Sequence, residues 1–147
     1  MTQAAFGAST AAPVPALDAT APYVATVGRL LLAAIFLISG FGKLTAAAGT
    51  IGYIAQAGLP APAVAYAVAL IVELGGGLLL VVGYQARLVA AALVVFALAT
   101  AFAFHSNFAD QNQMIHFLKN IAIAGGLLQV VAFGAGSFSV DAKGSRA

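Results

Sequence analysis

The segment 63–83 is apolar along its whole length except at one position. It reads AVAYAVALIVELGGGLLLVVG, and Glu73 carries its one formal charge. About 20 apolar residues in helical form cross the hydrocarbon core of a bilayer, so this segment is long enough to span a membrane. An unpaired carboxylate near the middle of such a span costs about 3 kcal/mol on insertion scales. Glu73 is therefore expected either to be protonated or to have a partner inside a bundle.

Three further segments are similarly long and apolar, which predicts four membrane spans in all. Hydrophobic residues make up 63% of the chain and charged residues 7%, whereas a soluble domain carries about 25% charged residues. Backbone groups in lipid must be hydrogen-bonded within the segment, and no alternating pattern suggests a barrel. The predicted fold is all-α, an integral membrane four-helix transmembrane bundle. The predicted spans are 23–44, 62–82, 87–105 and about 114–133.

The connections between these spans add detail to the bundle. In the connection 45–61, Ile51, Ile54 and Ala55 recur at helical spacing before Gly58-Leu59-Pro60 breaks the pattern. We expect a short helix there, lying at the membrane interface between the first two spans. The connection 83–85 is so short that the second and third spans should be antiparallel neighbours.

The two ends of the chain differ in composition from the spans. Residues 1–22 are rich in Ala, Pro and Thr and lack both the basic and the apolar region of a cleavable signal. We therefore expect a flexible tail over 1–22, a transmembrane domain over 23–134 and a second flexible tail over 135–147. The first span then has to act as an uncleaved targeting signal.

Six basic residues are scattered along the chain and form no patch, so nucleic-acid binding is excluded. Four spans place both termini on the same side of the membrane. The excess of basic residues on that side predicts that the termini are cytoplasmic. That side carries Arg29, Arg87, Lys143 and Arg146, and the opposite side carries Lys43 and Lys119.

A stripe of small and polar residues on the first helix should face the bundle. Its members follow three- and four-residue spacing: Arg29, Ala33, Phe36, Gly40 and Lys43. For Arg29 we favour an alternative, in which the side chain reaches out to the interface because it lies near the start of the span. For Lys43 both interpretations remain open.

The fourth span begins with the richest polar cluster, in which His116, Lys119 and Asn120 share one face. A lysine more than a turn inside a span needs an anion or water. Glu73 is the one acid expected inside the bundle, so we predict that Lys119 approaches it, directly or through water. Two alternatives remain: Lys119 extends outward to lipid headgroups, or Glu73 serves only as a packing group bonded to another helix.

His105 and His116 should lie together at the outer rim, joined by a short loop. Two histidines could ligate haem or another metal, but the one carboxylate nearby is Asp110. Interfacial hydrogen bonding or proton relay is favoured, and no metal site is predicted. The chain has no cysteine, which excludes disulfides, thiolate ligands and iron–sulfur clusters.

The chain resembles the DoxX family of small four-helix bacterial membrane proteins from about residue 27 to 133. The stretches that carry the resemblance are GRLLLAAIFLISGFGKL, GLPAP, ELGGGLLLVVGYQARLVAAAL and FHSNFADQNQMIHFLKNIAIAGGLL. The resemblance implies an inner-membrane protein linked to redox enzymes, since the family name comes from a subunit of a membrane thiosulfate:quinone oxidoreductase. The matching positions are Gly28, Arg29, Gly40, Lys43, Glu73, Arg87, His105, Lys119 and Asn120.

Three functional hypotheses follow, and a redox-linked accessory subunit is favoured on the resemblance. A quinone would lie between the helices, with its carbonyls bonded by His105, Lys119 or Asn120 and with His116 and Lys43 also near it. Glu73, with Lys119, would handle the proton. Such a subunit needs a redox enzyme as its protein partner. The alternatives are a non-catalytic anchor, assembly or cargo-binding module, and a small proton-coupled transporter that acts as a homo-oligomer.

Overall fold

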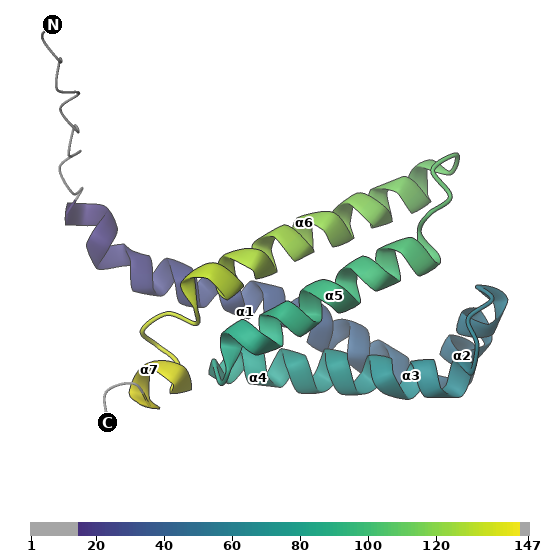
Figure 1. Cartoon of the computed structure of the whole chain (residues 1–147), viewed down its shortest axis with the longest axis horizontal. Coiled ribbons are helices and arrows are strands. Elements are labelled where there is room, and N and C mark those ends of the chain that lie inside the picture. The colour runs from purple at the N-terminus through teal and green to yellow at the C-terminus, as the bar shows by residue number, and fades with distance from the viewer. Residues whose placement is uncertain (1–14, 145–147) are drawn as a thin grey trace, which may run out of the picture.

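The computed structural model describes residues 15–144, and within them every regular element is a helix. Four helical stretches of this region are long and apolar enough to cross a membrane: Ala19–Thr45, Pro62–Val82, Ala86–Phe104 and Gln111–Phe133. The predicted all-α membrane bundle with four spans is therefore confirmed. The elements in chain order are α1 (Pro15–Thr45), α2 (Ala47–Gln56), α3 (Pro62–Leu70), the π-helical segment η1 (Ile71–Gly75), α4 (Gly76–Val82), α5 (Ala86–Phe104), α6 (Gln111–Phe133) and α7 (Val140–Gly144), as Figure 1 shows.

The first helix is longer than predicted. It begins at Pro15, so residues 15–22 are helical and do not belong to a flexible tail. Pro22 lies inside this helix, where its ring removes one backbone donor without ending the helix. Residues 1–14 lie outside the described residues.

The short helix predicted between the first two spans is present as α2. Its Tyr53 ring stacks on Phe104 at the end of α5, with ring centroids 5.4 Å apart. This contact holds α2 against the end of the bundle, at the right of Figure 1. Its position at a membrane interface remains a prediction.

Small residues at Gly76 and Gly77 let the helices approach closely. A Cβ on Gly77 would lie 2.8 Å from the Leu37 side chain of α1, and a Cβ on Gly76 would lie 3.1 Å from Leu93 of α5. α5 packs along α6 and α1 packs along α4, and these two pairs meet in a shared apolar core. Its largest fully buried side chains are Leu80, Leu93 and Leu127.

The segment after α6 is folded against the bundle, so the prediction of a flexible tail over 135–147 is wrong for residues 135–144. The Asp141 carboxylate accepts hydrogen bonds from the backbone N–H groups of Gln85 and Ala86 at 2.7 and 2.8 Å. The Asp141 N–H in turn donates to the Gly83 carbonyl at 3.0 Å. Asp141 thus bonds the free N–H groups at the start of α5, which a local N-cap side chain would otherwise satisfy. Residues 145–147 lie outside the described residues.

Arg29 is buried beneath this segment, which corrects the interpretation that its side chain reaches the interface. Only 3% of the residue is exposed, and its Nη2 donates to the Phe138 carbonyl at 2.9 Å. The guanidinium also lies directly against Gly83, whose φ of 68° favours glycine. Residues 135–144 fold back over α1, which was not predicted, and this packing encloses Arg29.

The start of α1, the segment α7 and the 83–85 turn lie at one end of the bundle, and α2 and the 105–110 loop lie at the other (Figure 1). Arg29, Arg87 and Lys143 belong to the end that holds the 83–85 turn, as predicted, whereas Arg146 lies outside the described residues. The Arg87 guanidinium donates to the Val131 and Ala132 carbonyls at the end of α6. That this end faces the cytoplasm remains a prediction.

Candidate functional site

Glu73 lies at the centre of the π-helical segment that interrupts the second span. The wider π-helical turn shifts the register of the side chains that follow, and such turns are frequent at functional sites. The residue is only 4% exposed. Gly40 of α1 lies directly opposite, since a Cβ there would lie 2.8 Å from Leu74 and 3.2 Å from the Glu73 Cβ. A glycine at position 40 therefore lets α1 approach the segment that carries the acid.

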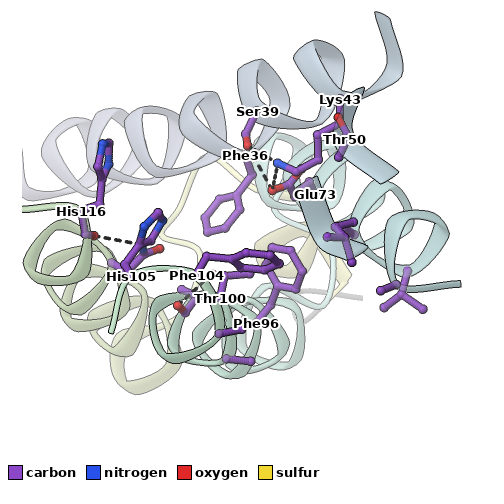
Figure 2. A pocket seen from close by; sticks show the side chains of 18 of the residues that line it. Phe36, Ser39, Lys43, Thr50, Glu73, Phe96, Thr100, Phe104, His105 and His116 are labelled. Carbon is purple, nitrogen blue, oxygen red and sulfur yellow. Dashed lines mark hydrogen bonds and ion pairs between the residues drawn. The ribbon is translucent and has the colours of Figure 1, made fainter. Parts of the chain in front are cut away.

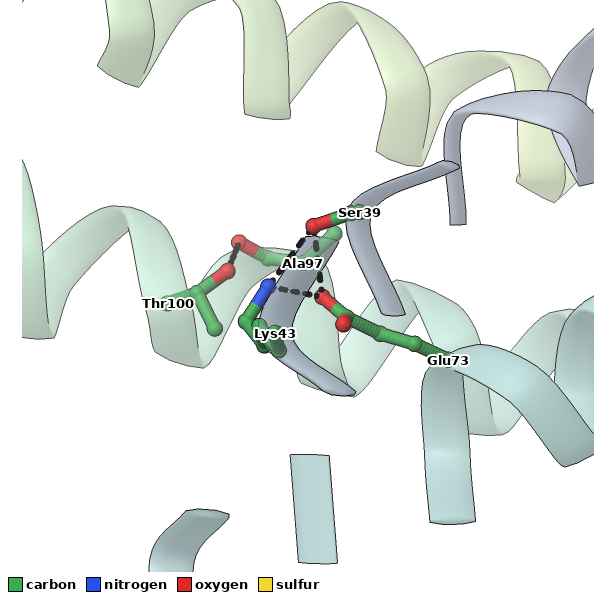
Figure 3. Close-up of polar contacts among 5 residues, drawn as sticks. All are labelled: Ser39, Lys43, Glu73, Ala97 and Thr100. Carbon is green, nitrogen blue, oxygen red and sulfur yellow. Dashed lines mark hydrogen bonds and ion pairs between the residues drawn. The ribbon is translucent and has the colours of Figure 1, made fainter. Parts of the chain in front are cut away.

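The partner of Glu73 is Lys43, which lies on the inward-facing stripe of α1. The Lys43 Nζ lies 2.9 Å from the Glu73 Oε1 and also donates to the Ser39 Oγ at 2.7 Å. The Ser39 hydroxyl donates to the same Oε1 at 3.1 Å, so the three side chains close a triangle of hydrogen bonds (Figure 3). Ser39 and Lys43 are one turn apart on one helix face, and this spacing aims both at Glu73.

A direct pair between Lys119 and Glu73 is absent, because Lys43 is the cation bonded to the carboxylate, and an approach of Lys119 through water remains a prediction. Lys119 is exposed and lies on α6, at the opposite wall of the cavity, whereas Lys43 lies on α1, which packs against the η1 segment that carries Glu73. Lys43 is therefore the nearer cation. The sequence did place Lys43 on the inward stripe of α1, but it could not show which helix lies beside which. Ser39, one turn before Lys43, is a further partner of Glu73 that the sequence analysis did not single out.

One oxygen of the Glu73 carboxylate accepts no hydrogen bond from the described residues. This oxygen, Oε2, is buried. A buried acceptor without a donor costs about 1–3 kcal/mol, and in native proteins it usually has a reason such as a water, a ligand or a catalytic role. The carboxylate is thus able to accept one more hydrogen bond.

Glu73 also lines a cavity of about 500 Å³ between the helices (Figure 2). This volume lies within the range of about 300–1,000 Å³ that small-molecule pockets occupy. Much of the wall is apolar, with three phenylalanine rings contributed by Phe36, Phe96 and Phe104. A flat apolar molecule would be shielded from water by these rings. The polar side chains in the wall are Ser39, Lys43, Thr50, Tyr53, Glu73, Thr100, His105, His116, Lys119 and Asn120.

Every residue that the sequence singled out as a candidate lines this one cavity: Lys43, Glu73, His105, His116, Lys119 and Asn120. They divide between two walls. Lys43 and Glu73 come from α1 and η1, and His116, Lys119 and Asn120 come from α6. The Asn120 amide is partly engaged within its own helix, where Nδ2 donates to the His116 carbonyl at 3.0 Å.

The two histidines form a stacked pair at the end of the cavity near the 105–110 loop. Their ring centroids lie 5.0 Å apart with an angle of 24° between the planes. His105 is oriented by Gln113, whose Oε1 lies 2.7 Å from the His105 Nδ1. Among the described residues, no group of three or more His, Cys, Asp or Glu side chains could hold a metal ion. The pair can supply hydrogen bonds to a polar group in the cavity.

Comparisons with known proteins place this chain beside bacterial inner-membrane proteins. The DoxX family model matches residues 24–106. Inner membrane protein YqjF of Escherichia coli (strain K12) is 38% identical over 115 residues, which cover 78% of this chain and 87% of the relative. Inner membrane protein YphA of the same organism is 32% identical over 130 residues, or 85% of this chain and 93% of the relative. No solved structure gives a significant match.

Proposed function

The chain belongs to the DoxX family of membrane proteins, and from this premise we propose that it is a redox-linked accessory subunit of the bacterial inner membrane that binds a quinone between its helices. The observation that carries the proposal is the cavity. It combines an aromatic, apolar wall with a buried acid that retains one free acceptor. Ligand sites typically combine a mostly apolar lining with a few convergent polar groups.

A quinone fits this lining by its chemistry. Its flat ring matches the apolar space between Phe36, Phe96 and Phe104, and its tail is compatible with the surrounding lipid. Donors for the ring oxygens are present on the α6 wall, where Lys119, Asn120 and His116 line the cavity. When bound, a quinone supplies electron transfer coupled to proton uptake.

The Ser39–Lys43–Glu73 triangle would serve as the proton-handling group. Lys43 and Ser39 occupy one carboxylate oxygen, and the second oxygen is free to accept a hydrogen bond or a proton. A general acid or base must lie within hydrogen-bond reach of the atom it serves, and Glu73 lines the cavity in which that atom would lie. The lysine beside it holds the carboxylate in place.

A partner protein is part of the proposal. The chain contains no cysteine, so it has no thiol through which electrons could enter. Electrons would come from a redox enzyme bound to the membrane surface. We propose that the end holding α2, His105 and His116 faces the periplasm, in keeping with cytoplasmic termini.

The test is purification in a mild non-ionic detergent. The proposal predicts a quinone in the lipid extract, measured by mass spectrometry, a matching ultraviolet absorbance band, and a redox enzyme among the co-purifying proteins. A preparation with no extractable quinone, no chromophore and no redox partner would show that the proposal is wrong. A non-catalytic module would instead keep its function in Glu73→Gln and lose little beyond stability.

A further inference from the structure

The charges around the cavity do not balance. Among the described residues that line it, Glu73 is the one carboxylate, and it is paired with Lys43 at 2.9 Å. Lys119 lines the same cavity and forms no hydrogen bond or ion pair with another described residue. The cavity therefore carries one uncompensated positive charge.

The position of Lys119 makes this excess charge significant. It lies on α6 within the span Gln111–Phe133, more than two turns after the helix begins at Gln111. A cation at such a depth is costly unless an anion or water compensates it. His105 and His116 also line the cavity, but a neutral imidazole can only accept a hydrogen bond from Lys119 and brings no negative charge. Asp110, the acid of the adjoining loop, does not line the cavity. Its carboxylate accepts hydrogen bonds from the backbone N–H groups of Asn112 and Gln113.

We propose that the cavity selects a ligand with an anionic head, and that Lys119 binds this head at the α6 wall. The inference rests on the proposed function, because it names the kind of quinone that the same cavity would bind. An acidic quinone, whose ring carries an ionised hydroxyl, has the required charge. A neutral quinone would leave Lys119 uncompensated.

Glu73 gives this ligand a direction. The Glu73 residue lines the cavity, and its carboxylate repels an anionic group. The anionic oxygen therefore turns toward Lys119, and the uncharged part of the ring turns toward Glu73. One edge of the quinone ring faces the wall formed by α1 and η1, and the opposite edge faces the wall formed by α6 (Figure 2).

The experiment compares two probes that differ in charge and by one methyl group. One is an alkyl-substituted hydroxynaphthoquinone, which is an anion at neutral pH, and the other is its uncharged methyl ether. Binding of each to the purified full-length protein in a non-ionic detergent is measured by equilibrium dialysis. The proteins compared are the wild type, Lys119→Gln, Lys119→Arg and the control Lys143→Gln, which removes an exposed charge from α7 outside the cavity.

The inference predicts that the wild type binds the anion about tenfold more tightly than the ether, a preference worth about 1.4 kcal/mol. Lys119→Gln loses this preference, while Lys119→Arg and Lys143→Gln keep it. Lys119 is exposed, so its substitution should leave the fold intact, which a monodisperse elution profile checks.

Equal binding of both probes to the wild type would overturn the inference while leaving the proposed quinone site in place. A preference that survives in Lys119→Gln would overturn it as well. A third contrary result is an anionic phospholipid that is retained by the wild type, lost from Lys119→Gln and not displaced by the hydroxynaphthoquinone. That result would assign Lys119 to a lipid headgroup. Failure of the proposed function itself is seen separately, in a lipid extract without quinone.

Discussion

Lys43 of α1 and Glu73 of η1 form an ion pair 2.9 Å long within the membrane spans. The carboxylate side chain is 6% exposed and the lysine side chain 27% exposed, so the pair reaches from the core to the cavity. Removing one partner of a buried pair leaves an uncompensated charge, and this costs more than the intact pair contributes.

A double-mutant cycle should reveal this pair in the stability of the protein. Lys43→Met alone leaves the buried carboxylate without its cation, and we expect a loss of about 1–3 kcal/mol. Lys43→Met combined with Glu73→Met should recover much of that loss. Thermal unfolding in detergent measures both. If the two single losses simply added in the double mutant, the pair would not be coupled.

Gly40 should tolerate no larger side chain. Gly40→Val would bring side-chain atoms against Leu74, whose side chain would lie 2.8 Å from the new Cβ, and separate α1 from the acid. Overpacking of this kind costs about 1–3 kcal/mol. The matched control is Gly42→Val, two residues along the same helix, where a Cβ would meet nothing within 4 Å. A lower unfolding temperature for Gly40→Val alone is expected, and equal effects of the two changes would contradict the close approach.

Asp141 should be needed to hold the C-terminal segment on the bundle. Asp141→Ala removes the acceptor for the Gln85 and Ala86 N–H groups, and loss of a helix N-cap acceptor costs about 1 kcal/mol. The released segment should then be cut by trypsin after Lys143 faster than in the wild type. Asp110→Ala is the control, since it removes a similar N-cap acceptor from α6 at the other end of the bundle. Equal cleavage rates in Asp141→Ala and the control would show that Asp141 does not retain the segment.

Much of the fold could be predicted because lipid imposes strong rules on the sequence. The lengths of the apolar segments predicted the four spans, and the second span matches the predicted bounds Pro62–Val82. The helical spacing of Ile51, Ile54 and Ala55 predicted α2. Each of these features depends on residues that are close together in the chain.

Features that depend on distant residues were missed. Which cation reaches Glu73 depends on which helices are neighbours. The sequence pattern favoured Lys119 as the direct partner, whereas the structure has Lys43. The burial of Arg29 depends on a segment more than a hundred residues away, in which the Phe138 carbonyl accepts a hydrogen bond from Arg29. The π-helical turn at Glu73 and the cavity beside it also arise from packing between helices. The candidate residues were nevertheless brought to one cavity, because their polar character marks the inward faces of their helices.

The most direct test of the quinone site is to fill the cavity from one wall. Ala103 lines the cavity and is exposed, so Ala103→Phe should occupy the space without disturbing the core. The matched control is Ala92→Phe, on the same helix at an exposed position that does not line the cavity. The measurement is the amount of quinone extracted per protein by mass spectrometry. The account predicts that the wild type and Ala92→Phe carry the same amount and that Ala103→Phe carries little, whereas equal amounts in all three proteins would contradict it.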